Sequence, residues 1–322
     1  EPGQAQAHRW LALALQQQDQ PEAAMDALQQ ALQLAPDDAQ LHLQQAGLLL
    51  AQHRYEGADE ALLRTTELNP NAFEAYLMQA HLAIGRNDID TAARQATMAA
   101  RLEPEHPEVM ALQGMVALYR DDADRAVQLL SEAARQMPND PRVLYALGSA
   151  YQAKDMLAFA EQAFRRVIEI NPKMTSLHGQ VVQLALRQGN VEAAHQQLQQ
   201  ALQVPGLDTP ALQRLGAEIA LQADQPMQAL EQLRPMLKAN PDDRRTVELL
   251  LACWQRLGRE EEARTELDAV LAEHTQLPHL WLARLAPEGF GSPGAVAVAD
   301  RWIEAMPEFV PALEARLRLH EA

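Results

Sequence analysis

The stretch that decides the fold is Pro141–Pro172, PRVLYALGSAYQAKDMLAFAEQAFRRVIEINP. Its apolar residues recur every three or four positions in two segments, so we expect two amphipathic helices, at 140–153 and 157–170. The polar residues 154–155 separate them as a turn. Pro172 ends the second helix, because proline lacks an N–H group and disfavours the helical conformation in the residue before it. The stretch therefore predicts a helical hairpin.

Small residues inside this hairpin predict how closely its two helices pack. Gly148 and Ala160 have almost no side chain, so the helices can approach each other there. Tyr151 and Phe164 are large enough to fill the space further along. Their order favours a tight pair of helices with little room between them.

The same pattern recurs along most of the chain. Prolines that close each unit follow one another at intervals of 34 residues, at Pro36, Pro70, Pro104, Pro138 and Pro172, and Pro241 follows 69 residues later. This pattern closely resembles the tetratricopeptide repeat, whose period is 34 residues. The resemblance implies an all-α, right-handed α-solenoid (superhelix) of about nine helix-turn-helix repeats. In that family, helix A of each repeat lines the inner, concave surface and helix B lies outside.

The markers divide the chain into a regular array, residues 1–275, and two less regular parts. The eight regular repeats are expected at about 5–38, 39–72, 73–106, 107–140, 141–174, 175–208, 209–243 and 244–277. In the seventh, Leu215-Gly216 and Pro241 fit registers one residue apart, so a slightly long turn is expected at Ala223 to Pro226. Residues 276–306 predict a degenerate ninth repeat. Residues 307–322 predict either a C-terminal capping helix or the truncated first helix of a next repeat.

The net charge is −17 at pH 7, and residues 1–140 hold 21 acidic but only 9 basic residues. Such a surface repels phosphate backbones and anionic lipids, so neither nucleic acid nor a membrane is an expected partner. The acidic residues either keep a long solenoid soluble or steer a basic partner segment to it. No apolar run approaches the roughly 20 residues that span a bilayer.

The source and compartment are predicted from composition alone. Three lysines against 24 arginines favour a bacterial source with a GC-rich genome. No signal sequence is visible, so a cytoplasmic location is expected, with the periplasm as the alternative if a signal peptide was removed. Self-association through the faces of the terminal repeats stays open.

No catalytic constellation stands out in the sequence. Cys253 is the single cysteine, which excludes an internal disulfide and a cysteine-cluster metal site, and it is expected to be a buried apolar residue. His274 and His279 lie near Glu273, but Pro278 intervenes and the spacing matches no helical metal-binding pair. The sequence therefore predicts no metal, no cofactor and no enzyme activity.

The resemblance places the function in the concave groove. Tetratricopeptide repeats generally bind a peptide or a helix through helix A side chains at the second, fifth, sixth, ninth and twelfth positions. The asparagine-containing carboxylate clamp and the asparagine ladder known from two branches of the family are absent. In this chain the corresponding positions supply the candidate site residues Arg9, Gln40, Leu43, Gln44, Glu74, Leu77, Met78, His81, Met115, Arg142, Tyr145, Ser149, Gln152 and Gln183. The same positions also hold Ala111, Gln180, Arg245 and Glu248.

Two functions from different classes remain. The first is a scaffold that binds a segment of an unidentified partner protein in this groove, with Leu43, Leu77, Met78, Met115 and Tyr145 as apolar anchors and glutamines as adaptable hydrogen-bonding groups. The alternative is an N-terminal substrate-recognition or targeting region of a larger enzyme, such as a sulfotransferase, a glycosyltransferase or an oxygenase. The full-length reading frame would discriminate between them.

Overall fold

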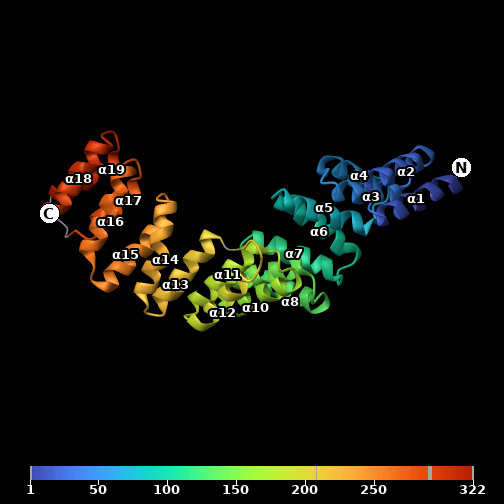
Figure 1. Cartoon of the computed structure of the whole chain (residues 1–322). Helices are drawn as coiled ribbons and strands as arrows, with labels where there is room; N and C mark the ends of the chain where they lie inside the picture. The colour runs from blue at the N-terminus through green and yellow to red at the C-terminus, as the bar shows by residue number, and fades with distance from the viewer. Residues whose placement is uncertain (1, 208, 289–291, 321–322) are drawn as a thin grey trace. The chain divides into compact units, whose positions relative to one another are not determined.

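A computed structural model describes residues 2–207, 209–288 and 292–320. Within these residues every regular element is an α-helix, as Figure 1 shows, and the expected all-α solenoid class is confirmed. None of the described helices is both long and apolar enough to cross a membrane. Residues 289–291 of the expected ninth repeat and residues 321–322 lie outside the described residues.

The helices fall into two compact units, residues 1–170 and 171–322. Within each unit the helices follow one another as hairpins (Figure 1). The first unit contains α1 (Pro2–Gln17), α2 (Pro21–Leu34), α3 (Ala39–Ala51), α4 (Tyr55–Leu68), α5 (Phe73–Gly85), α6 (Ile89–Leu102), α7 (Pro107–Tyr119), α8 (Ala123–Gln136), α9 (Pro141–Ala153) and α10 (Leu157–Ile170). The second contains α11 (Thr175–Arg187), α12 (Val191–Leu202), α13 (Pro210–Gln222), α14 (Pro226–Ala239), α15 (Arg244–Leu257), α16 (Glu260–Glu273), α17 (Pro278–Leu285), α18 (Pro293–Ala305) and α19 (Val310–His320).

The hairpin of α9 and α10 confirms the two helices predicted for Pro141–Pro172. Gly148 is buried in α9 and faces Phe164 of α10, and a Cβ atom at Gly148 would lie 2.6 Å from Cε1 of that ring. Ala160 and Phe164 are 0% and 1% exposed. The close approach of the two helices therefore depends on the missing side chain of Gly148, as expected.

The turns of the first eight hairpins share one backbone conformation. One residue of each turn has a positive φ of 56–71°: the second turn residue in the first seven hairpins and the first turn residue, Gly258, between α15 and α16. The residue after it donates its N–H to a carbonyl five residues back, as in Asp122 to Ala117 at 3.0 Å and Gln225 to Ala220 at 2.8 Å. This is a Schellman motif, which satisfies carbonyls at the end of the first helix. The left-handed turn residues are Asp19, His53, Asn87, Asp121, Asp155, Gly189, Asp224 and Gly258.

The expected long turn at Ala223 to Pro226 is wrong. Helix α13 ends at Gln222 and α14 begins at Pro226, so three residues connect them, as in the regular hairpins. The extra residue instead lies before α13, because α12 ends at Leu202 and seven residues separate it from Pro210. Gly206, with a φ of 81°, allows the sharper course of this connection. The division of the chain into repeats stays a prediction.

A buried ion network holds the hairpin of α17 and α18 to α16. Arg284 is 8% exposed and donates to Asp268 Oδ2 at 3.1 Å and to Glu288 Oε1 at 2.6 Å. Arg264 of α16 also lies 3.0 Å from Glu288. Helix α19 packs against α18. Both interpretations of residues 307–322 stay predictions.

Candidate functional site

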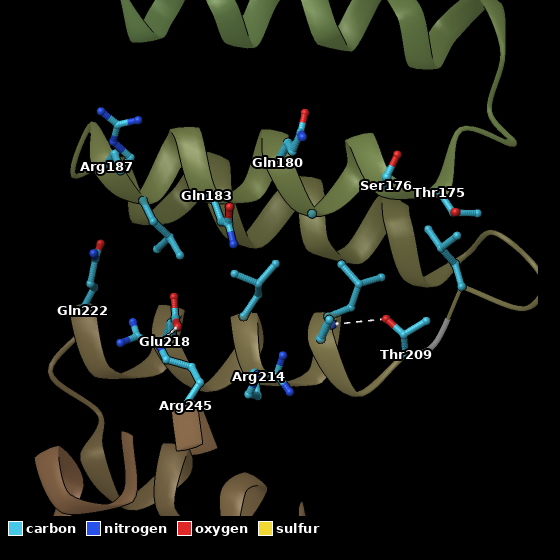
Figure 2. A pocket seen from close by; sticks show the side chains of 16 residues that line it. Thr175, Ser176, Gln180, Gln183, Arg187, Thr209, Arg214, Glu218, Gln222 and Arg245 are labelled. Carbon is cyan, nitrogen blue, oxygen red and sulfur yellow. Dashed lines mark hydrogen bonds and ion pairs between the residues drawn. The ribbon is translucent and has the colours of Figure 1, made fainter. Parts of the chain in front are cut away.

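A cavity of about 870 Å³ runs between α11 and α13 in the second unit and reaches the start of α15 (Figure 2). Helices α11 and α13, and α13 and α15, pack directly against each other, so the cavity lies along a row of first helices of successive hairpins. Its lining residues are Thr175, Ser176, Gly179, Gln180, Gln183, Leu186, Arg187, Leu207, Thr209, Ala211, Leu212, Arg214, Leu215, Glu218, Gln222 and Arg245.

The left-handed turn residues show that these side chains occupy equivalent positions. Gly179 and Arg214 each lie ten residues before the turn residue of their hairpin, as Tyr145 does in the first unit. A Cβ atom at Gly179 would lie 3.7 Å from Leu215 Cδ1 and 3.9 Å from Leu212 Cδ2. A larger side chain at this position would have to extend into the cavity. Gly179 therefore keeps the cavity open at a position where the fifth hairpin has the larger Tyr145.

The floor and rim of the cavity differ in chemistry. Leu186, Leu207, Leu212 and Leu215 form a floor and are 1–6% exposed. The rim is polar, and Figure 2 shows the hydroxyl residues Thr175, Ser176 and Thr209 at one end and the charged residues Arg187, Glu218 and Arg245 toward the other. A bound segment would therefore meet hydroxyl, amide and guanidinium groups before apolar ones.

Arg245 and Arg214 form ion pairs with carboxylates next to the cavity. Arg245 donates through Nε to Glu218 Oε1 at 2.9 Å and through Nη1 to Glu248 Oε2 at 3.0 Å. Arg214 pairs through Nη1 with Asp243. Asp243 also caps α15 by accepting from the backbone N–H of Thr246, and it accepts from the Thr246 hydroxyl at 2.8 Å. These contacts order both guanidinium groups before any partner arrives.

Gln180 carries an unsatisfied polar atom at this site. Its Oε1 is buried and has no hydrogen-bond partner among the described residues. A buried acceptor without a partner costs free energy, which a donor from a bound segment would recover. Of the inner-face residues predicted from sequence, Gln180, Gln183 and Arg245 line this cavity.

In the first unit, a smaller cavity of about 410 Å³ brings together three predicted residues, Met78, His81 and Arg142. Leu50 and Tyr55 also line it. Burial lowers the pKa of His81, and the nearby positive charge of Arg142 lowers that pKa further. Hydrogen bonds from Arg142 lower the pKa of Asp140, which accepts from Arg142 Nη2 at 2.8 Å.

Predicted residues near the start of the chain lie outside that cavity. Arg9 donates to Gln40 Oε1 at 3.4 Å, and its guanidinium lies 5.9 Å from the ring of Trp10, which is 62% exposed. Leu43 packs against the buried cluster around Ala46. Both amide atoms of Gln44 are buried without a partner among the described residues.

The remaining predicted residues divide between core and surface. Leu77 is 6% exposed and belongs to a core cluster, so it offers a partner little surface, contrary to its expected role as an anchor. Met115 is half-buried against the core, and Tyr145 is 40% exposed with its ring 5.6 Å from that of Phe164. The half-buried Ser149 donates to the Tyr145 carbonyl at 3.0 Å. Glu74 and Gln152 are exposed.

No group of three or more His, Cys, Asp or Glu side chains is placed to hold a metal ion within the described ranges. Cys253 is buried, as expected, and burial raises the pKa of its thiol to about 11. A thiol with this pKa is a poor nucleophile at neutral pH.

Comparison with family models identifies the repeats. Two tetratricopeptide repeat models match, one at residues 77–141, 111–175 and 214–278 and the other at residues 15–82. The chain belongs to the tetratricopeptide repeat family. No curated protein sequence matches it.

Solved structures with the same fold share little sequence with this chain. PilW, a type IV pilus biogenesis factor, matches with a TM-score of 0.57 and 17% identity over 65% of this chain and 96% of its own. PilF of Pseudomonas aeruginosa matches at 0.54 and 18% over 65% and 95%. A tetratricopeptide repeat protein from Parabacteroides merdae matches at 0.53 and 14% over 78% and 99%. These similarities support the fold and do not identify a partner.

Proposed function

We propose that this protein is an interaction scaffold and that the cavity between α11 and α13 binds an extended segment of a partner protein. One observation carries the proposal: the cavity of about 870 Å³ lies along the inner-face positions of three successive first helices. In tetratricopeptide repeats these are the positions expected to contact a partner. The smaller cavity at Met78, His81 and Arg142 is a second contact point within the first unit.

The dimensions of the site suit a short extended segment. Helix α11 rises about 1.5 Å per residue, so Ser176 and Arg187, at the two ends of the cavity, are about 16 to 18 Å apart. An extended chain advances about 3.3 Å per residue and covers this distance with about five or six residues. Hydroxyl and amide side chains along the rim can bind both the N–H and the C=O groups of such a backbone.

The first experiment is a selection of peptides from a random 12-residue phage library on the whole protein. Binding of the selected peptides is then measured by fluorescence polarisation on the wild type and on Gly179→Trp. The indole at residue 179 would occupy the cavity, because a Cβ atom there already contacts the two leucines of the floor. We expect the variant to bind at least about tenfold more weakly, a loss of about 1.4 kcal/mol.

The matched control is Gly47→Trp. Gly47 is also a helical glycine, in α3 of the first unit, and a Cβ atom there would have nothing within 4 Å. Peptides bound in the second unit should keep their affinity in this variant, provided that circular dichroism shows both variants to be folded. Equal binding to Gly179→Trp and wild type would refute the proposed site.

A further inference from the structure

We infer that the segment bound between α11 and α13 is acidic, with at least one carboxylate that reaches Arg187, Arg214 or Arg245. This inference rests on the proposed function, because it names the chemistry of the segment that the same cavity binds. It is argued from the charges that face the cavity, from their intramolecular partners and from the charge of the surrounding unit.

The lining of the cavity is basic although the protein is acidic. Its described lining includes three arginines and one glutamate, and Asp243 and Glu248 pair with two of these arginines, whereas residues 171–322 as a whole hold 20 acidic and 14 basic residues. A carboxylate is therefore repelled by the net charge of this unit and attracted by the guanidinium groups of the cavity. Such an arrangement favours specificity, because an acidic segment has few alternative positions where it can bind.

The acidic partners of Arg214 and Arg245 leave both able to bind a further carboxylate. Arg214 lines this cavity and also a second one of about 590 Å³ next to α13, which its partner Asp243 lines as well. The side chain of Glu218 is 20% exposed, whereas that of Arg245 is 55% exposed, so Arg245 is the more accessible member of its pair. A guanidinium carries five N–H donors, and the bonds to protein carboxylates engage Nη1 of Arg214 and Nε and Nη1 of Arg245. Further donors therefore remain for a bidentate contact with a ligand.

The position of the charged groups also predicts how the segment lies. Arg187 and Arg245 are near one end of the cavity and the hydroxyl residues Thr175, Ser176 and Thr209 are at the other (Figure 2). The carboxylate is expected at the arginine end. Small or polar residues of the segment lie at the hydroxyl end, next to Thr175, Ser176 and Thr209.

The test sequences the peptides selected on the whole protein and measures each one on the double variant Arg187→Gln/Arg245→Gln. Arg166→Gln is the control, because this exposed arginine of α10 lies in the first unit. We expect enrichment of Asp and Glu among peptides that Gly179→Trp fails to bind, and at least about tenfold weaker binding to the double variant. Affinity should also fall as salt is raised, and the control should bind like the wild type.

The possible outcomes separate this inference from the proposed function. Suppose that the selected peptides fail to bind Gly179→Trp. If these peptides are neutral or basic, or if they bind the double variant as well as the wild type, the acidic inference is overturned and the proposed site is retained. Acidic peptides that bind Gly179→Trp as well as the wild type would lie elsewhere and overturn the inference too. If no selected peptide depends on residue 179, both the site and its chemistry are refuted.

Discussion

Gly148→Ala tests the close packing on which the hairpin of α9 and α10 depends. The added Cβ atom would lie 2.6, 2.7 and 3.0 Å from three carbon atoms of the Phe164 ring, whereas carbon atoms in contact are about 3.5–4.0 Å apart. Phe164 is 1% exposed, so its ring cannot move into solvent. Either the ring or one of the helices must therefore shift by about 1 Å.

Two effects of opposite sign set the magnitude. Alanine is favoured over glycine inside a helix by about 1 kcal/mol. Overpacking of a tight core costs about 1–3 kcal/mol, and occasionally more. Because the clash involves a buried aromatic ring rather than a flexible side chain, we expect the packing cost to be larger, with a net destabilisation of about 1–2 kcal/mol.

The assay is urea unfolding followed by circular dichroism, with Gly47→Ala as the matched control. Gly47 lies inside α3, and a Cβ atom added there would have nothing within 4 Å, so this variant should gain up to about 1 kcal/mol. Phe164→Leu provides a second check, since the smaller side chain should lessen the cost of Gly148→Ala and give a coupling of about 0.5–3 kcal/mol. A Gly148→Ala protein as stable as Gly47→Ala would refute the close approach of α9 and α10.

Three further predictions concern single groups. Asp121 has a φ of 59°, which glycine adopts at lower steric cost, so Asp121→Gly should raise the free energy of unfolding by about 0.5–1 kcal/mol. Gly189 has a φ of 71°, so Gly189→Ala should lower the free energy of unfolding by about 1–2 kcal/mol in the same urea assay. The folded protein holds the pKa of His81 below its unfolded value of about 6.5, so the unfolded state binds more protons and stability should fall as pH drops from 7.5 to 5.5. His81→Gln should reduce this dependence in thermal melts, and an unchanged slope would contradict the assignment. Cys253, buried with a thiol pKa of about 11, should react with Ellman's reagent at pH 8 only after unfolding, and a fast reaction of the native protein would show that the thiol is accessible.

The hairpins could be predicted from the sequence because the spacing of apolar residues predicts the helices and small residues such as Gly148 predict where the helices pack closely. Apolar spacing placed the two helices of residues 141–172 within a residue of their observed ends, and Gly148 faces Phe164 as its size required. The turns were predicted as polar segments, but the left-handed conformation of one residue in each was not, although its signal is present. Asp, Asn, Gly or His recurs at intervals of 34 or 35 residues from Asp19 to Gly258, and these include the residue types that tolerate a positive φ.

The site could be predicted only in part. Its position depends on the register of each repeat and on which side chains the adjacent hairpins leave exposed. The inner-face positions were chosen from the family pattern, which found Gln180, Gln183 and Arg245 for the larger cavity and Met78, His81 and Arg142 for the smaller one. Leu77 was chosen by the same rule, yet it is buried in the core. Periodicity gives the face of a helix, but the depth of a side chain in that face depends on the packing of adjacent hairpins.

The ambiguous register of the seventh hairpin is related to the cavity between α11 and α13. Counting back from Asp224, Gly216 is equivalent to Leu147 of the fifth hairpin, and Leu215 is equivalent to the residue before it. Leu215 therefore lines the cavity floor, while the position that a leucine fills in the regular hairpin has no side chain and lines the cavity of about 590 Å³ next to α13. A local departure from the repeat thus removes core packing on one side of α13 and supplies an apolar floor on the other. Departures of this kind, rather than the best matches to the pattern, are where a binding site is to be sought in a repeat protein.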